Sequence, residues 1–462
     1  MKKLQFFSIF LVVALLAGLL STTAVAAPEE SDTFENLTIS AKAALLVDGS
    51  TGQVLLQQDA HEQLYPASLT KCMTTLLVLQ AVDEGTLSLD QTITASQTAI
   101  NMLTDDSSSA GIQAGEQLTV EQLLYCVMVQ SANEACYILA EAVSGSVDAF
   151  VEEMNAEAER LGCEDTHFVN PCGLHDPEHY TSAWDMYLIV KEAMNYSMFM
   201  TLANTKTYTL PATNMSEERT FHTTNGLIDR WRYTEYVYSY AQGIKTGHTS
   251  DAGYCLVSYA EQGSRSLIGV VLGAQAVTEN GSTTIQSFSE MRRMFEWGFS
   301  SFTSTTILDH ASLIEEIPVT LSRQTNYVSL HPSEDVTVLL PSNVAAEDLV
   351  QEVTLDSESV EAPVTAGQKL GTITVSDSSG NVYTTTDLVA ANDVSASQVL
   401  TLLHRIQVLF ANPLVKILAV VIAVAVIFLI VSYLRRRPRR YRGGQSYRTR
   451  RRNRRYHGRR RW

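Results

Sequence analysis

The sequence predicts an α+β fold, of the broad α/β class, followed by a small all-β sandwich domain and a C-terminal transmembrane helix. Strand patterns lie near both ends of residues 27–301, and helical patterns fill the interval between them. Short β-rich runs alternate with turns from residue 302 to residue 394, which is the spacing of a sandwich. Residues 414–434 form an apolar run of 21 residues, long enough to cross a bilayer. These observations predict two folded domains and an anchor.

The N-terminus has the layout of a secretory signal peptide, which we place at residues 1–26. Two lysines precede an apolar run over residues 6–20, and small residues at 24–26 form a candidate cleavage site. The alternative is an N-terminal membrane anchor, which the shortness of the apolar run disfavours. A signal peptide predicts that the chain is exported.

The first domain, residues 27–301, opens with a predicted hairpin whose strands lie at residues 43–47 and 54–57. A buried helix should begin near Ser68 and end near residue 84. The later helices are expected at residues 119–128, 134–143, 147–161, 183–194 and 285–299, the first of them opened by a capping-box pattern. The later strands are expected at residues 206–210, 219–223, 243–247, 254–259 and 266–272.

The second domain, residues 302–394, is expected to be built from short strands. These lie at residues 317–321, 336–340, 351–355, 370–375 and 382–386. Beyond them, residues 395–413 repeat apolar side chains at helical spacing, which predicts an amphipathic helix at the membrane surface. The transmembrane helix is expected to follow at residues 414–434.

The charge distribution orients the chain across a membrane. The formal net charge is -17, yet 15 of the 33 basic residues and no acid lie in residues 435–462. Positive charge follows a span on its cytoplasmic side, so we expect a single-pass protein of the cell membrane with a cytoplasmic arginine-rich tail and extracytoplasmic domains. The acidic body argues against nucleic-acid binding, and membrane lipid is the expected partner of the tail.

The cysteines and histidines indicate neither disulfides nor a cofactor. The six cysteines are Cys72, Cys126, Cys136, Cys163, Cys172 and Cys255. Their spacing forms no disulfide framework, so no bridge is assigned. Cys172, His175 and His179 have a spacing that suits zinc, but no fourth ligand lies nearby. We therefore expect no metal and no cofactor.

A serine and a lysine three residues apart stand at the start of the predicted buried helix. Positions i and i+3 share a helix face, so the Lys71 amine can reach the Ser68 hydroxyl. A serine is a poor nucleophile without a neighbouring base. A lysine can be that base where burial, nearby positive charge or a helix dipole favours its neutral form. Ser68 is therefore the candidate nucleophile, although this pair alone is weak evidence.

Two further motifs follow in order. Ser131 and Asn133 interrupt a helical block, whereas the other Ser-x-Asn triplet, at residues 379–381, falls in a predicted hairpin turn. The third motif lies on a predicted strand and comprises Lys245, Thr246, Gly247, His248 and Thr249. Three motifs in this order are much stronger evidence than any one of them.

The trio resembles the signature of the penicillin-recognising serine acyl-transferases. Within them the chain is similar to the low-molecular-mass penicillin-binding proteins, serine D-alanyl-D-alanine carboxypeptidases of the peptidase family S11 type. Residues 170–174 and 179–183, the second β domain and the C-terminal attachment also fit, so the resemblance covers roughly residues 38–410. It implies a penicillin-binding/β-lactamase-like transpeptidase fold, in which an antiparallel sheet is flanked by helices and joined by a helical subdomain.

The resemblance also implies the chemistry of acylation. Ser68 would attack the carbonyl between the last two D-alanines of a peptidoglycan stem peptide, and Lys71 would take its proton. Ser131 would relay a proton to the leaving amine. Asn133 would bind the peptide backbone and help to place Lys71. β-Lactams mimic the substrate and would acylate the same serine.

Substrate recognition is implied for the strand motif. Lys245, with Thr246 and Thr249, would hold the terminal carboxylate of the peptide. Gly247 lies within the same substrate-binding strand. The backbone N–H groups of Ser68 and His248 would form the oxyanion hole.

The function favoured by the sequence is removal of the terminal D-alanine from stem pentapeptides during peptidoglycan biosynthesis, which contributes to cell-wall organisation and cell shape. A class A-like β-lactamase is one alternative, but no deacylating Glu-x-x-Leu-Asn pattern follows Asn133. A catalytically silent penicillin-binding regulator is the other, and the intact Ser68, Lys71 and Lys245 argue against it. The third residue of the stem peptide is not fixed by the sequence.

Overall fold

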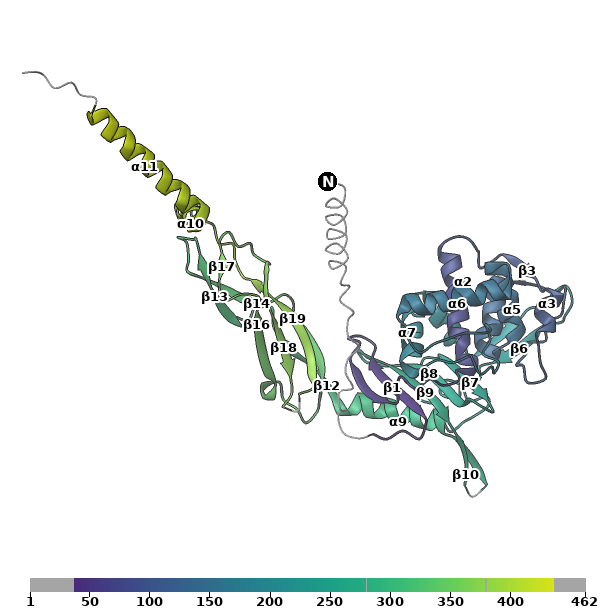
Figure 1. Ribbon diagram of the computed structural model, residues 1–462. Helices are drawn as coiled ribbons and strands as arrows, with labels where there is room; N and C mark the ends of the chain where they lie inside the picture. Colours follow the sequence, from purple (N-terminus) through teal and green to yellow (C-terminus); the bar gives the residue numbers. More distant parts are fainter. Residues whose placement is uncertain (1–36, 280, 379, 436–462) are drawn as a thin grey trace, which may run out of the picture. The chain divides into compact units, whose positions relative to one another are not determined.

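A computed structural model describes residues 37–279, 281–378 and 380–435. The predicted signal peptide, residues 1–26, lies outside these residues. So do Ser379 of the second Ser-x-Asn triplet and the arginine-rich tail from residue 436 onward. The described chain has an N-terminal α+β part and a C-terminal β-rich part, each with its own sheets (Figure 1).

A five-stranded antiparallel sheet forms the centre of the N-terminal part, with strand order β2-β1-β9-β8-β7. Its strands are β1 (Ala43–Asp48), β2 (Val54–Gln58), β7 (Lys245–Thr249), β8 (Gly253–Gln262) and β9 (Arg265–Ala274). The predicted N-terminal hairpin is confirmed, with Leu45 opposite Gln57. Because β1 also pairs with β9, the two ends of this part of the chain meet in one sheet.

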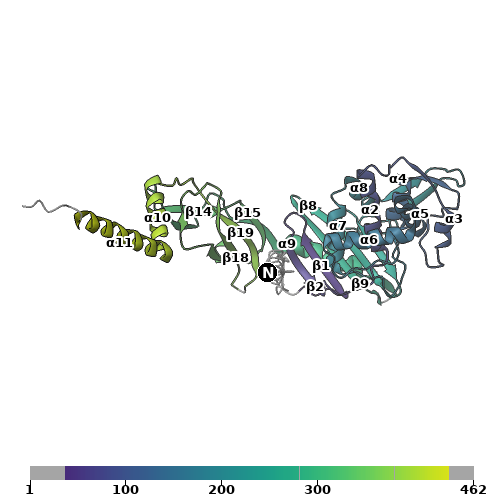
Figure 2. The ribbon, with the colours of Figure 1, turned by 45° about the horizontal axis from the view of Figure 1, so that its top comes forward.

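Helices cover both faces of this sheet (Figures 1 and 2). Leu45 and Val47 of β1 belong to the core beneath the helical block, whereas Ala44 and Leu46 belong to the core beneath α9 (Gln286–Ser301). Successive side chains of a strand point to opposite faces, so β1 is buried on both sides. This double burial explains why its sequence is apolar throughout rather than alternating.

The helical block contains the buried helix that the sequence placed after Ser68. Its elements are the 3-10 helix η1 (Ala67–Thr70), α2 (Lys71–Asp83), α3 (Gln97–Asn101), α4 (Val120–Tyr125), the π-helix η2 (Cys126–Gln130), α5 (Asn133–Ser144), α6 (Val147–Leu161), α7 (Ala183–Ala193) and α8 (Ser197–Ala203). Most of α2 is buried, since other helices surround it and its side chains are apolar on all sides. The predicted capping box before α4 is confirmed, because Thr119 and Gln122 exchange both bonds.

Three two-stranded sheets complete the N-terminal part. They pair β3 (Thr92–Thr94) with β4 (Gln117–Thr119), β5 (Thr207–Leu210) with β6 (Arg219–His222), and β10 (Ala276–Glu279) with β11 (Ser282–Ile285). The strands of the first and third pairs have only three or four residues each, too few to show a periodic pattern, and they were not predicted from the sequence. Strand β7 begins at Lys245, two residues after the predicted start, because Gly243 has a φ of 81° and leaves the extended region.

The C-terminal part confirms a second, β-rich domain. A six-stranded sheet has the order β16-β18-β19-β14-β13-β17, and a separate pair joins β12 to β15. The strands are β12 (Phe302–Leu308), β13 (Glu315–Thr320), β14 (Tyr327–Pro332), β15 (Val336–Pro341), β16 (Val350–Leu355), β17 (Val360–Glu361), β18 (Lys369–Ser376) and β19 (Val382–Ala390). Sequence analysis missed β12, β14 and β17. In β12 most side chains are serine or threonine, and β17 has only two residues.

Two helices end the described chain. α10 (Gln398–Ala411) is short and apolar. α11 (Pro413–Arg435) has a mean hydropathy of 3.3 over an 18-residue window. Among the described residues, α11 is the one helix long and apolar enough to cross a membrane. These helices lie within or near residues 395–413 and 414–434, where the sequence predicts helices.

Candidate active site

Ser68 and Lys71 lie at the junction between η1 and α2. Ser68 is inside η1, and Lys71 is the first residue of α2. Lys71 Nζ lies 2.9 Å from Ser68 Oγ, within hydrogen-bond distance. The Lys71 side chain is fully buried, so its amine is withdrawn from bulk water and faces the serine hydroxyl.

Two oxygen acceptors complete the surroundings of the Lys71 amine. Lys71 Nζ donates to Asn133 Oδ1 at 2.8 Å and to the backbone oxygen of Cys172 at 2.7 Å. Neither oxygen can donate a hydrogen. The amine is therefore held by contacts from three separate parts of the chain.

Ser131 and Asn133 occupy the break between η2 and α5 that the sequence predicted. Ser131 ends the π-helix with a φ of 63°, a left-handed conformation that is uncommon for residues other than glycine. Its side chain is nearly buried, yet it lines the same cavity as Ser68. Asn133 begins α5, and its N–H donates to the backbone oxygen of Ser108 at 2.8 Å.

Strand β7 brings the third motif to the edge of the sheet beside Ser68. Gly247 packs directly on this turn, because a Cβ at Gly247 would lie 2.8 Å from the Pro66 oxygen and 3.1 Å from the Ser68 nitrogen. A larger residue at position 247 would push the strand away from the serine. Thr246 Oγ1 bonds Thr224 Oγ1, and the Thr249 hydroxyl accepts from the Ala252 N–H at 3.0 Å.

Lys245 is a second buried amine near Lys71. It is 1% exposed, and its Nζ donates to the backbone oxygen of Thr246 at 3.0 Å. Burial first, and then the positive charge of Lys71, lower the pKa of Lys245 to about 7. A carboxylate bound nearby would favour the ammonium form of Lys245.

The loop at residues 170–174 braces the serine turn from the other side. Gly173 has a φ of 82°, and a Cβ at this position would lie only 1.8 Å from the Ala67 oxygen. His179 Nε2 donates to Thr70 Oγ1 at 2.8 Å, and Thr70 Oγ1 donates to the Ala67 oxygen at 2.9 Å. Burial lowers the pKa of His179 to about 3, so its imidazole is neutral and structural.

A cavity of about 400 Å³ opens onto the serine. It is lined by five of the sequence-predicted residues, Ser68, Ser131, Thr246, Gly247 and His248. The others, Lys71, Asn133, Lys245 and Thr249, are not among its lining residues. Lys71, Asn133 and Lys245 are buried, and Lys71 and Lys245 contact the lining residues Ser68 and Thr246.

Sequence reasoning missed several residues of this site. The cavity is also lined by Asp106, Ser108, Thr224, Arg232, Tyr233, Tyr254, Cys255, Ile285, Ser287 and Phe288. Most of these come from loops or from the short strand β11, which carry no periodic signal. The contribution of Cys172 is a backbone oxygen, and such a contact depends on loop conformation rather than on residue type.

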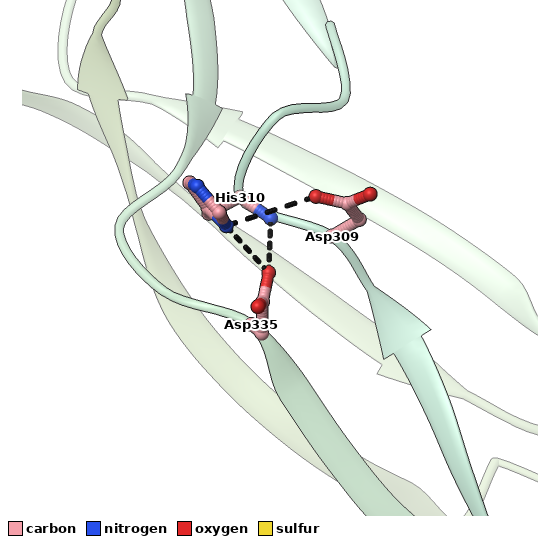
Figure 3. A group of neighbouring side chains, drawn as sticks. All are labelled: Asp309, His310 and Asp335. Carbon is pink, nitrogen blue, oxygen red and sulfur yellow. Dashed lines mark hydrogen bonds and ion pairs between the residues drawn. The ribbon is translucent and has the colours of Figure 1, made fainter.

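The two candidate metal-ligand groups have other roles in the geometry. Both ring nitrogens of His179 are already bonded, to Thr70 Oγ1 and to the Val169 N–H. Within the described ranges, one set of three potential ligand atoms converges, from Asp309, His310 and Asp335 of the β-rich part (Figure 3). His310 Nδ1 lies 2.7 Å from Asp335 Oδ1, and all three residues are exposed. This geometry is that of a surface ion pair.

All six cysteines are buried and free. Burial raises the pKa of the Cys72 and Cys136 thiols to about 12. These thiols are therefore neutral small packing groups near the site.

Comparisons with known families agree with the two parts of the fold. Residues 27–276 match the family described as D-alanyl-D-alanine carboxypeptidase. Residues 302–396 match the family described as penicillin-binding protein 5, C-terminal domain. The first match contains all nine candidate site residues, and the second coincides with the β-rich part.

Individual relatives align along most of the chain. The D-alanyl-D-alanine carboxypeptidase DacF of Bacillus subtilis is 30% identical over 398 residues, which is 86% of this chain and 97% of the relative. DacA of Escherichia coli is 32% identical over 343 residues, which is 72% of this chain and 79% of the relative. The crystal structure of penicillin-binding protein 5 from Haemophilus influenzae matches with a TM-score of 0.64 at 30% identity, covering 78% of this chain and 99% of that one.

Proposed function

The chain belongs to the D-alanyl-D-alanine carboxypeptidase family, and we propose that Ser68 is the nucleophile with which it removes the last D-alanine from peptidoglycan stem pentapeptides. It is a serine-type D-alanyl-D-alanine carboxypeptidase and a penicillin-binding protein. What we propose here is the assignment of that chemistry to individual residues.

The surroundings of Lys71 carry this proposal. A neutral lysine amine has two N–H donors and one lone pair. The Asn133 Oδ1 and Cys172 oxygens, at 2.8 Å and 2.7 Å, can only accept, so they would take both N–H groups. The lone pair would then face Ser68 Oγ at 2.9 Å. This arrangement suits a general base better than a structural cation.

Acylation follows from this geometry. Ser68 Oγ attacks the carbonyl carbon of the penultimate D-alanine while its proton passes to Lys71 Nζ, which gives a tetrahedral intermediate. The bond to the leaving nitrogen then breaks, and that nitrogen takes a proton relayed by Ser131. The products are free D-alanine and an ester on Ser68. Water hydrolyses the ester, which releases the shortened peptide and restores the serine.

Lys245 is proposed to recognise the carboxylate of the departing D-alanine. A buried ammonium gains most from a bound anion, since Lys245 forms no ion pair with any carboxylate of the described residues. Thr246 and Thr249 would add hydroxyl donors, once Thr249 is free of its bond to the Ala252 N–H. The N–H groups of Ser68 and His248 would hold the developing oxyanion, and Gly247 allows the two backbones to approach closely.

The finer organisation of the chain belongs to the same proposal. Residues 1–26 would direct export, and residues 302–394 would form a sandwich-like spacer. The amphipathic α10 would lie at the lipid surface, while α11 would span the membrane once and leave the arginine-rich tail in the cytoplasm. The carboxypeptidase would thus work on the outer side of the cell membrane, and β-lactams would inhibit it by acylating Ser68.

The test is D-alanine release by the purified full chain in detergent. The natural chain and Ser68→Ala are incubated with a stem pentapeptide, with Ser50→Ala, an exposed turn serine, as the matched control. We expect release by the natural chain and by Ser50→Ala, and none by Ser68→Ala. Equal release by both serine variants would refute the assignment of Ser68.

A further inference from the structure

Two side chains of opposite charge line the active-site cavity without a protein partner. Asp106 and Arg232 both border the cavity that contains Ser68. Within the described part of the chain, neither the Asp106 carboxylate nor the Arg232 guanidinium makes a hydrogen bond or ion pair. Each charge is therefore available to a ligand, and the two come from segments far apart in the sequence.

Asp106 belongs to a loop, residues 104–116, that is held in place by buried charges. Glu134, next to Asn133 on α5, accepts from Ser109 Oγ and from the Ala110 N–H, both at 2.7 Å. Arg219 of β6 donates to the backbone oxygens of Ala110 and Gly111, at 3.0 Å and 2.9 Å. We call this segment the Asp106 loop. Hydrogen bonds from Glu134 and Arg219 therefore hold this loop in a fixed position at the edge of the cavity.

Arg219 also forms a buried ion pair with Glu116 at the end of the Asp106 loop. In addition, the Asn133 N–H donates to the backbone oxygen of Ser108. The Asp106 loop is therefore tied to the same residue that holds Lys71. Hydrogen bonds thus connect the loop to Ser68 through Asn133 and Lys71.

Arg232 belongs to an aromatic-rich segment, residues 229–240, on the β7 side of the cavity. The Trp231 ring stacks on His222 of β6 with centroids 3.9 Å apart. The Tyr236 hydroxyl accepts from the Ile285 N–H at 2.8 Å, and the Tyr238 N–H donates to the Leu227 oxygen at 2.9 Å. We call this segment the Arg232 segment. Its rings fix the backbone on both sides of the arginine.

We propose that this cavity selects stem peptides whose third residue carries both an ammonium and a carboxylate on its side chain, with the carboxylate bound by Arg232 and the ammonium by Asp106. The inference rests on the proposed function, because the peptide must first present its D-alanines to Ser68. The residue before the two D-alanines then lies next to the acylated position. A side chain with both charges would therefore pair its ammonium with Asp106 and its carboxylate with Arg232.

Lys245 accounts for the terminal carboxylate at the other end of the substrate, so Arg232 is not needed for it. A third residue with an amine alone would satisfy Asp106 and leave Arg232 without a partner. A third residue that carries both an ammonium and a carboxylate can bind Asp106 and Arg232 at the same time. The cavity thus distinguishes a diamino-dicarboxylic acid such as meso-diaminopimelate from lysine.

The test uses three synthetic pentapeptides that differ only at the third residue: meso-diaminopimelate, L-lysine or L-alanine. kcat/KM for D-alanine release is measured with the full chain in detergent. The natural chain is expected to prefer the diaminopimelate peptide over the lysine peptide by about fivefold or more, the size expected of an exposed ion pair or charge-assisted hydrogen bond.

Charge-neutral variants separate the two contacts. Arg232→Gln should lower kcat/KM for the diaminopimelate peptide until it equals that for the lysine peptide. Asp106→Asn should lower the rates for both amine-bearing peptides relative to the alanine peptide. Arg230→Gln and Asp105→Asn, neighbours that do not line the cavity, should keep the natural preferences. Labelling by a fluorescent penicillin checks that every variant is folded.

Three results would overturn the inference. The natural chain could release D-alanine from all three peptides without preference. Arg232→Gln could slow all three peptides equally, which would place the arginine on a carboxylate common to them. A diaminopimelate preference that survives in Arg232→Gln would also contradict it. Failure of the natural chain to release D-alanine from any peptide would overturn the carboxypeptidase proposal itself, together with this one.

Discussion

We propose different roles for the two buried lysines of the site, Lys71 and Lys245. Lys71 faces two acceptor oxygens and the serine hydroxyl, whereas Lys245 has a single backbone oxygen as its hydrogen-bond partner. Burial first, and then the charge of Lys71, disfavour the ammonium form of Lys245. The assignment of Lys71 as base and Lys245 as substrate-bound cation follows from these different surroundings.

Replacing Lys71 with arginine tests its role as base. A guanidinium stays protonated in proteins and cannot accept the serine proton. Lys71→Arg should therefore lower the acylation rate by about 10²- to 10⁴-fold, the usual contribution of a general base. The rate is followed with a fluorescent penicillin, and Lys191→Arg, on the partly exposed side of α7, serves as control. Near-natural acylation by Lys71→Arg would contradict the role.

The pH dependence of substrate capture tests Lys245. Its lowered pKa of about 7 means that the ammonium form is lost as the pH rises through that value, far below the ordinary range for lysine. We therefore expect kcat/KM for a pentapeptide to fall above about pH 7. The Lys245→Arg variant keeps its positive charge above pH 7. Any kcat/KM that remains in this variant should therefore not fall above pH 7. An unchanged fall in the arginine variant would assign it to another group.

At this scale the sequence singled out residues that the structure brings together around one cavity. Ser68, Lys71 and the β7 motif were recognisable because their types and order are distinctive. The Cys172 oxygen and Arg232 were not, since a backbone acceptor has no signature and a surface arginine is ordinary. Their roles appear only when the loops are placed around the serine.

At the scale of elements, glycine contacts set the distance between the strands, loops and helix that meet at Ser68. Gly247 lets β7 approach the serine turn, and Gly173 lets the loop at residues 170–174 pack on it from the other side. Both close approaches involve backbone atoms, which cannot move aside as a flexible side chain can. The site is therefore sensitive to a single added methyl group.

Gly173→Ala should destabilise the catalytic domain and slow acylation together. The positive φ alone costs an alanine about 1 kcal/mol, and the clash with the Ala67 oxygen should raise the total to about 2 kcal/mol or more. Gly162→Ala is the matched control, because Gly162 has a similar φ of 80° and open space around it. Thermal unfolding and penicillin labelling report the two effects. Equal destabilisation by both variants would contradict the contact.

Element types were largely predictable, whereas their pairing was not. The helix at residues 147–161 and the capping box at Thr119 were found because local signals define them. The pairing of β1 with β9 joins segments far apart in the chain and leaves no local trace. Strand β12 escaped because its side chains are mostly hydroxylic, and their strand state comes from pairing with β15.

At the scale of the whole molecule, the chain combines a catalytic domain, a β-rich domain and an apolar C-terminal helix in the order that the sequence predicted. The family matches at residues 27–276 and 302–396 fall on the first two. The third, α11, has a hydropathy of 3.3 over a length sufficient for a span. Local sequence patterns located these three regions, because helices with ordered motifs, short alternating strands and a long apolar run differ from one another.

A chain ending at residue 396 tests the anchor. It lacks α10 and α11, so it should be recovered in the soluble fraction and should still be labelled by a fluorescent penicillin. The full chain should sediment with membranes and be extracted only by detergent. A truncated chain that still sediments with membranes while remaining labelled would contradict the assignment of the anchor to these helices.

The most direct test of the catalytic assignment is the position of the covalent penicillin adduct. The full chain is incubated with benzylpenicillin, digested and mapped by mass spectrometry, alongside Ser68→Ala. One adduct is expected, on the peptide that contains Ser68, and none is expected in Ser68→Ala. An adduct on another residue, or an adduct of equal yield in Ser68→Ala, would contradict it.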